Sequence, residues 1–219
     1  VIDHLSDRIY AYLESYKLQG LNEGISENVI KVTGNPIVDI IKEHSKLFES
    51  GSKYLDNEVL DLSNNKFVLV TCHRRENILN EDSFKKITSL LNSIDDRKVI
   101  FPMGYKTQEI LKNSNISLNN NIKIIDPIGY LEFMYLLKKA DYVATDSGTV
   151  VEEACILNVP SIQMRYSTER PEVYDVEASV KFDPTSNNNF GHIIDKVNNL
   201  KTGWKNPFGD GNSSEIIVN

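Results

Sequence analysis

The chain has 219 residues, of which 40% are hydrophobic and 25% charged, as in a globular protein with one substantial core or two smaller ones. Its formal charge of −7 argues against a broad nucleic-acid-binding surface and leaves any phosphate to local arginines and helix ends. Its two cysteines form no spaced metal-binding pair, and no apolar run approaches the roughly 20 residues that span a bilayer, so we expect a cytoplasmic protein without metal, cofactor or membrane segment.

A short strand, a turn and a helix are predicted near the start of the chain. Residues 29–32 suit a strand, and the Gly-Asn-Pro sequence at 34–36 follows as a turn with proline at the first helical position. Apolar residues then recur at helical spacing and are expected to pack one face of that helix; they are Ile37, Ile40, Ile41, Leu47 and Phe48. The polar residues 57–65 are predicted to form a connector.

Strands and helices alternate from residue 66 onwards. The predicted strands are 66–71, 98–102, 122–125, 142–145, 161–164 and 180–182. The predicted helices between them are 82–94, 107–112, 131–139 and 150–157. This alternation implies right-handed crossovers, and the continuous apolar runs suit strands that are covered on both faces. The predicted fold class is therefore α/β, with a parallel, doubly wound sheet.

Polar residues suited to an anion follow several of these strands. One strand turns through Asp146-Ser147-Gly148 into a helix, whose first N–H groups lie at the positive end of the helix dipole and suit a phosphate. An ordinary Ser/Asp cap without a ligand is the alternative. His73 and Arg165 also follow strands. In open α/β sheets ligands lie beyond the carboxyl ends of the strands, so an anionic ligand is predicted at this edge.

Several motifs, in their order and spacing, resemble those of the non-hydrolysing UDP-N-acetylglucosamine 2-epimerases. The segments that carry the resemblance are 71–77, 145–148, 152–153 and 168–172, with support from 32–36, 126–133 and 206–211. The similarity extends over nearly the whole chain. It implies a Rossmann-like domain that forms one half of a two-domain glycosyltransferase-B-type fold.

The resemblance also implies how the chain divides. Residues 1–30 match the end of an N-terminal domain and the crossover, 31–205 match a Rossmann-like UDP-binding domain, and 206–219 match a C-terminal helical segment. The chain opens on Val1 without a methionine, so we expect most of the N-terminal domain to be missing. The implied partners are a UDP-sugar, that N-terminal domain and, at full length, a second copy in a homodimer, with neither nucleic acid nor membrane.

The implied activity is interconversion of UDP-N-acetylglucosamine and UDP-N-acetylmannosamine by elimination and re-addition of UDP, without a cofactor. The family's proton-transferring carboxylates lie in the N-terminal domain, so the isolated chain is expected to be inactive. Thr149 stands where the family usually has a second glycine, which keeps open an epimerase for a related UDP-N-acetyl-deoxyhexosamine. A glycosyltransferase of the same fold and a non-catalytic nucleotide-sugar-binding module are further alternatives.

The resemblance implies roles for particular side chains. His73 would bind the ligand and take part in catalysis, Phe133 would stack on uracil, although core packing is its alternative, and Arg170 would reach the nucleotide. The diphosphate would lie on Ser147, Gly148 and Thr149. Glu153 would repel a phosphate, so a ribose diol is its expected partner. Glu152 is expected to be a capping or surface residue, and Arg165 is a weaker candidate than Arg170. For Arg74 and Arg75 two alternatives stay open: a place at the ligand, or ion pairs with Glu76 or other surface acids.

Overall fold

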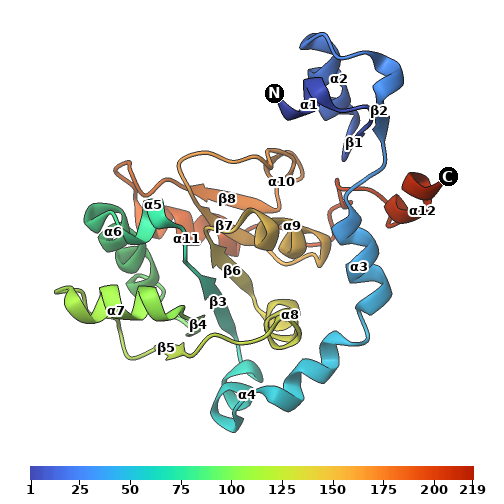
Figure 1. The fold of residues 1–219 in the computed structure, drawn as a ribbon. Helices are drawn as coiled ribbons and strands as arrows, with labels where there is room; N and C mark the ends of the chain where they lie inside the picture. The colour runs from blue at the N-terminus through green and yellow to red at the C-terminus, as the bar shows by residue number, and fades with distance from the viewer. The chain divides into compact units, whose positions relative to one another are not determined.

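The computed structural model describes residues 1–219. They form two compact units, residues 1–46 with 206–219 and residues 47–205 (Figure 1). The division expected from the resemblance, after residues 30 and 205, stays a prediction about the full-length protein. None of the helices has the length and apolar character that crossing a membrane requires.

The smaller unit contains a parallel two-stranded sheet and short helices. Its elements are α1 (Ile2–Leu5), β1 (Ile9–Ala11), α2 (Glu14–Asn22), the 3₁₀ helix η1 (Glu27–Val29), β2 (Ile30–Val32), α3 (Pro36–His44) and α12 (Ser213–Val218). The two ends of the chain meet within this unit, because the Asp39 carboxylate of α3 accepts hydrogen bonds from the backbone N–H groups of Ser213 and Ser214 at the start of α12, at 3.2 and 2.9 Å.

Helix α3 begins as the sequence predicts but packs differently. The Asn35 side chain accepts a hydrogen bond from the backbone N–H of Ile37 at 3.0 Å, and Pro36 is the first helical residue. The helix ends at His44, and its buried side chains are Val38 and Ile41. The expected apolar stripe from Ile37 to Phe48 is therefore correct only in part: Ile41 is buried, Ile40 is exposed, and Phe48 is buried but belongs to the next element.

The larger unit is built on six parallel strands. Its elements are the 3₁₀ helix η2 (Phe48–Tyr54), α4 (Asn57–Ser63), β3 (Phe67–Thr71), α5 (Arg75–Ile78), α6 (Glu81–Asn92), β4 (Lys98–Pro102), α7 (Tyr105–Asn113), β5 (Ile122–Ile125), α8 (Tyr130–Lys139), β6 (Tyr142–Thr145), α9 (Gly148–Ile156), β7 (Ser161–Met164), α10 (Glu172–Asp175), β8 (Ser179–Phe182) and α11 (Phe190–Asn198). The alternation of strands and helices expected from the sequence is confirmed.

The order of the strands is β5-β4-β3-β6-β7-β8, so β3 starts the sheet near its middle and the chain winds outward in both directions. β4 and β5 add on one side of β3, and β6, β7 and β8 add on the other. The order therefore reverses between β3 and β6, whose Thr71 and Thr145 are neighbours in register. A doubly wound sheet binds ligands at such a switch point, beyond the carboxyl ends of the strands.

Strand β3 shows why these apolar runs form the middle of the sheet. Val68 and Val70 are fully buried in a core that includes Ile87 and Leu91 of α6. The alternating residue Leu69 is equally inaccessible, although it lies outside that core. Side chains of a strand alternate between faces, so both faces of β3 are covered, as a continuous apolar run requires.

Residues 57–65 are not the connector that their polar composition predicts. Residues 57–63 form α4, in which Val59 and Ser63 are buried four residues apart on one side. One buried apolar side chain in a helix of seven residues gives almost no periodic pattern, so the sequence does not predict this helix.

Replacing Gly51 by alanine should destabilise the larger unit. Gly51 lies in η2 against the backbone at the start of α8, and an added Cβ would collide with the Leu131 carbonyl group. We expect the free energy of unfolding to fall by about 1–3 kcal/mol, as in an overpacked core, when urea denaturation is followed by circular dichroism. Gly191→Ala is the matched control, because its Cβ would meet only an oxygen at 3.5 Å, and equal losses in the two variants would contradict the steric explanation.

Candidate functional site

The buried carboxylate of Asp146 joins the ends of three strands. Asp146 directly follows β6 and is fully buried. It accepts hydrogen bonds from the backbone N–H groups of His73 and Arg74, after β3, and from the Asn77 amide, at 3.1, 2.9 and 3.1 Å. The same amide of Asn77 donates to the carbonyl oxygen of Met164, the last residue of β7, at 3.0 Å. These donors offset the cost of burying the carboxylate and fix the three strand exits together.

Neither Asp146 nor Asn77 is among the predicted ligand-binding residues, although both lie in segments that carry the resemblance, 145–148 and 71–77. In the sequence they stand out only as polar residues beside apolar strands, because the partners of Asp146 lie about 70 residues away along the chain.

The local environment of His73 depends on the same Asp146 carboxylate. Its Nδ1 lies 3.5 Å from Asp146 Oδ1, while 61% of the His73 side chain is exposed at the switch point. The Asp146 carboxylate therefore orients the imidazole on the side of Nδ1, and most of the remaining ring surface is open to solvent.

The start of α9 forms the second wall of the site. Ser147 caps this helix, with its Oγ accepting a hydrogen bond from the backbone N–H of Val150 at 3.4 Å, so the capping alternative describes one part of the geometry. Gly148 and Thr149 follow in the first turn, where the positive end of the helix dipole favours an anion. Two charged groups lie close to Gly148. If this glycine carried a Cβ, that atom would lie 3.7 Å from Glu169 Oε2 and 4.0 Å from Arg165 Nη1.

Arginine–carboxylate pairs surround this helix. Arg165, whose side chain is only 8% exposed, donates to both carboxylate oxygens of Glu169 at 2.6 and 3.1 Å. Arg170 forms an ion pair with Glu152. The expectation that Glu152 is a capping or surface residue is wrong, because it is buried on α9 and the Arg170 guanidinium offsets the cost of burying its charge. Arg74 pairs with Glu76 at 3.4 Å, which is one of the two alternatives for its side chain.

Glu153 is buried next to Glu152 but has a different partner. Successive helical residues lie about 100° apart around the axis, and Glu153 reaches Tyr130 of α8, whose hydroxyl donates to Oε1 at 2.9 Å. Burial raises the pKa of Glu153 to about 7, against the lowering effect of the Tyr130 hydrogen bond and with a further increase from the charge of Glu152. This carboxyl therefore changes its charge near neutral pH.

A hollow of about 290 Å³ lies beside Tyr130, at the carboxyl ends of β3 and β4. Its lining residues are Thr71, Pro102, Pro127, Ile128, Gly129, Tyr130, Phe133 and Val150. Phe133 is half-buried and turns towards this hollow, so core packing does not describe its surroundings. The flat aromatic and aliphatic walls suit an apolar or aromatic ring.

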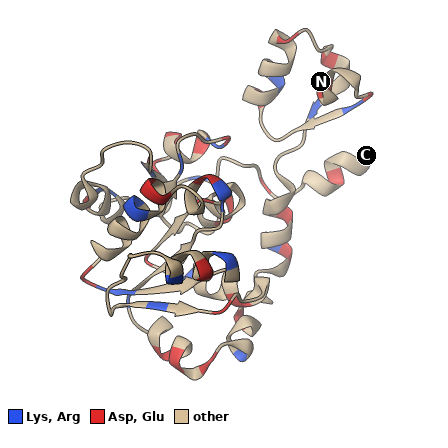
Figure 2. Cartoon of the chain, turned by 60° about the vertical axis from the view of Figure 1, so that its left-hand side comes forward, with Lys and Arg blue, Asp and Glu red and all other residues tan.

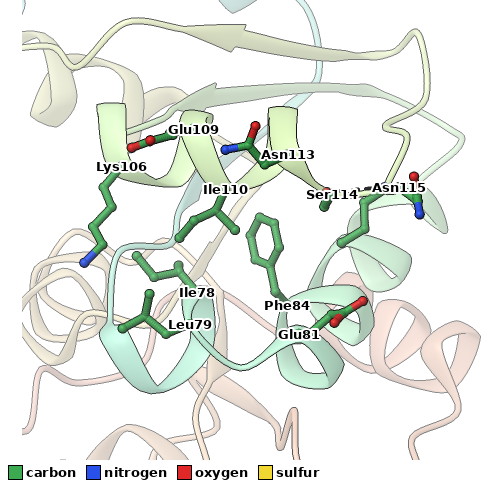
Figure 3. A pocket seen from close by; sticks show the side chains of 11 residues that line it. Ile78, Leu79, Glu81, Phe84, Lys106, Glu109, Ile110, Asn113, Ser114 and Asn115 are labelled. Atoms are coloured by element: carbon green, nitrogen blue, oxygen red, sulfur yellow. Dashed lines mark hydrogen bonds between the residues drawn. The ribbon is translucent and has the colours of Figure 1, made fainter.

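A larger hollow, of about 510 Å³, lies between α5, α6 and α7 (Figure 3). Its centre is formed by Ile78, Phe84 and Ile110, and it contains none of the residues that the sequence predicts for the site.

No group of three or more His, Cys, Asp or Glu side chains in residues 1–219 could hold a metal ion. Figure 2 shows Lys and Arg interspersed with Asp and Glu through the helices of both units. The predicted site residues therefore lie together at the switch point between β3 and β6 and not at the larger hollow.

Comparisons with known proteins show the family to which the chain is similar. The sequence matches the family model described as UDP-N-acetylglucosamine 2-epimerase over residues 1–219. A UDP-N-acetylglucosamine 2-epimerase from Methanococcus maripaludis is 39% identical over 226 residues, covering 99% of this chain and 61% of that protein. The crystal structure of the Methanocaldococcus jannaschii UDP-GlcNAc 2-epimerase in complex with UDP-GlcNAc and UDP is 40% identical, with a TM-score of 0.83 over 99% of this chain and 61% of that one.

The structure of the Neisseria meningitidis UDP-GlcNAc 2-epimerase bound to UDP-GlcNAc is 26% identical, with a TM-score of 0.74 over 99% of this chain and 61% of that chain. The chain thus spans about three fifths of the length of the relatives that it matches. These likenesses confirm the expected fold class, a Rossmann-like sheet that forms one half of a two-domain glycosyltransferase-B-type fold.

Replacing Glu153 by glutamine should stabilise the chain in the absence of ligand, increasingly so at higher pH. The pKa of Glu153 is about 7 in the folded state and 4.5 as its ordinary value, so the folded state holds this proton more strongly than the unfolded state. The stabilisation that protonation gives is present at acidic pH and is lost as the pH rises from 4.5 to about 7. Glutamine does not ionise, so its advantage should grow to at most about 3 kcal/mol.

The measurement is urea denaturation of wild type and Glu153→Gln at pH 5 and pH 8. A difference in the free energy of unfolding that is the same at both values would show that Glu153 does not ionise in this range. Glu152→Gln provides the contrast, because removing the charge that pairs with Arg170 should destabilise the chain.

Proposed function

We propose, starting from the fact that the chain belongs to the UDP-N-acetylglucosamine 2-epimerase family, that it is the UDP-binding part of an enzyme that interconverts UDP-N-acetylglucosamine and UDP-N-acetylmannosamine. The observation that supports this most directly is the convergence of three different kinds of surface at one switch point. They are an aromatic-walled hollow, a buried carboxylate and a helix start flanked by arginine. A uridine diphosphate offers a matching ring, diol and dianion in the same order.

The uracil ring would occupy the hollow and stack on Phe133. Glu153 would accept hydrogen bonds from the ribose hydroxyls, which lie next along the nucleotide. The diphosphate would then reach the first turn of α9, where Ser147, Gly148 and Thr149 lie. His73, exposed at the end of β3, would face the same group from the opposite side of the switch point.

In this reaction a base removes the proton from C2 of the sugar while the C1–O bond breaks, so that UDP leaves and 2-acetamidoglucal remains. Re-addition of UDP at C1 and protonation of C2 on the opposite face give the epimer. The start of α9, the neighbouring arginines and His73 would stabilise the charge that develops on the leaving diphosphate. The groups that remove and return the C2 proton would lie in the part of the relatives that this chain does not span.

Thr149 supports a second candidate substrate. It is exposed in the first turn of α9, at a position that the family usually fills with glycine. A hydroxyl and methyl group there would alter contacts beyond the diphosphate and could favour a UDP-N-acetyl-deoxyhexosamine. Assaying both sugars distinguishes the two epimerases, and transfer of sugar to an acceptor without epimer formation would indicate a glycosyltransferase instead.

The chain should bind UDP, and the residues around Glu169 should tune its affinity. Glu169 holds Arg165 next to the start of α9, where a diphosphate would compete with the carboxylate for the guanidinium. Glu169→Gln should therefore bind UDP more tightly than wild type does. Arg165→Ala and Arg170→Ala should each lose about 1.5–3 kcal/mol of UDP binding energy, the scale of a charge-assisted hydrogen bond.

Isothermal titration calorimetry with UDP and with uridine checks this arrangement. Uridine has no phosphate, so its affinity should stay the same in all three variants. Loss of UDP binding in Arg170→Ala alone would assign the diphosphate to Arg170 and leave Arg165 with a structural role. Absence of UDP binding in wild type would overturn the proposed function itself.

The 219-residue chain should bind UDP without epimerising UDP-N-acetylglucosamine. A version extended upstream to the length of its relatives should epimerise this sugar nucleotide. Each positioned proton-transfer group typically contributes about 10²–10⁴-fold to a rate, so a bound leaving group alone is insufficient. Proton NMR of the C2 epimer measures the difference. Equal turnover by both versions would place the catalytic groups within residues 1–219.

A further inference from the structure

Tyr130 lies at the edge of the hollow and is in contact with η2. It is the first residue of α8, and the Phe48 ring of η2 packs edge-on against its ring, with centroids 6.1 Å apart and an interplanar angle of 86°. Gly51 of the same 3₁₀ helix lies against the backbone of Leu131 so closely that no side chain fits between them. The first turn of α8 is therefore packed closely against η2, while Tyr130 itself is 47% exposed.

The Tyr130 side chain links the hollow to the carboxylate next to it. Its ring lines the hollow together with Phe133 and Val150, and its hydroxyl donates to Glu153 Oε1 at 2.9 Å. Glu153 is only 3% exposed and lies on α9, so this hydrogen bond connects two helices across the site. A carboxylate has about four lone-pair directions on its two oxygens. The tyrosine takes one of them and leaves the others for a ligand.

We propose that Tyr130 is a positioning residue: its hydroxyl holds the Glu153 carboxylate in the orientation that accepts hydrogen bonds from the ribose diol of the ligand. This inference rests on the proposed function, because it needs a nucleotide in the hollow. An unfixed carboxylate would have to be ordered when the ligand binds, which lowers affinity. Because Tyr130 also forms a wall of the hollow, the same side chain sets the distance between the ring of the ligand and the group that recognises its sugar.

The charges around Glu153 give the hydrogen bond a second effect. Tyr130 faces it from α8, and Glu152 precedes it on α9, paired with Arg170 from the segment before α10. Burial and the charge of Glu152 raise the pKa of Glu153, whereas the Tyr130 hydroxyl lowers it. Removal of that hydroxyl would leave more of the carboxyl protonated at neutral pH, and a protonated oxygen donates a hydrogen bond instead of accepting one.

The test compares the dissociation constants of 2′-deoxy-UDP and UDP between pH 6 and pH 8.5. Both nucleotides carry the same diphosphate and base, so the ratio of their dissociation constants isolates the ribose hydroxyl. In wild type this ratio should rise with pH, with a midpoint near the pKa of Glu153, about 7. It should reach on the order of 10-fold, the scale of a hydrogen bond to a charged group.

Tyr130→Phe keeps the ring and the wall of the hollow and removes only the hydroxyl. Its ratio should be smaller than in wild type at neutral pH, and its midpoint should lie at higher pH. Tyr135→Phe, on the same helix but outside the lining of the hollow, is the matched control and should reproduce the wild-type profile. In a Glu153→Gln background the change from Tyr130 to Phe should have no effect on the ratio, because the hydroxyl acts through Glu153.

A Tyr130→Phe profile that superimposes on the wild-type profile would overturn the inference while leaving UDP binding, and with it the proposed function, intact. An equal loss for UDP and 2′-deoxy-UDP would also overturn it, because that result would assign Tyr130 a role in the shape of the hollow only. If wild type binds neither nucleotide, the proposed function fails and the inference falls with it.

Discussion

A single buried carboxylate holds the candidate site together. Asp146 lies where the sheet reverses its direction of winding, and its hydrogen bonds reach backbone or side-chain donors from the segment after β3. Through Asn77 it also reaches the end of β7. Without it, the segment after β3 would lose its hydrogen bonds to the end of β6, which hold His73 and the start of α9 in their relative positions. A charge is suited to this task because an unmet buried carboxylate is costly, so the loops that satisfy it are held tightly.

The charged side chains of the site are already satisfied before any ligand arrives. Glu152 has Arg170, Glu169 has Arg165, and Glu153 has a tyrosine hydroxyl. Binding of an anionic nucleotide would therefore exchange the partners of the arginines, whereas Glu153 would keep Tyr130 and offer its remaining lone pairs to the ligand. Such an exchange keeps buried charges paired in both states, and the affinity measures the difference between two sets of contacts. Selectivity between nucleotides then depends on how well each one replaces the internal partners.

Most of the sheet could be predicted from local sequence. The strands at 98–102, 122–125, 142–145 and 161–164 have the predicted bounds, because each is a short, largely apolar run, and all but the first are followed directly by a charged residue. Helix α4 was missed because its only strong signal is one buried valine. The burial of Glu152 was missed for another reason: its partner Arg170 lies 18 residues further along the chain, and Tyr130 lies 23 residues before Glu153. Pairings of this kind depend on how helices meet on the sheet, which spacing along one helix does not reveal.

The hydrogen bonds between Asp39 and the start of α12 have a consequence for how the protein can be cut and rebuilt. They bring both ends of the chain into the smaller unit, so the larger unit, residues 47–205, is an uninterrupted insert within it. Every strand of the six-stranded sheet lies inside that insert. The insert is therefore the natural module to excise or transplant, whereas the smaller unit depends on segments from both sides of the insertion and loses α12 when the chain is interrupted anywhere between them.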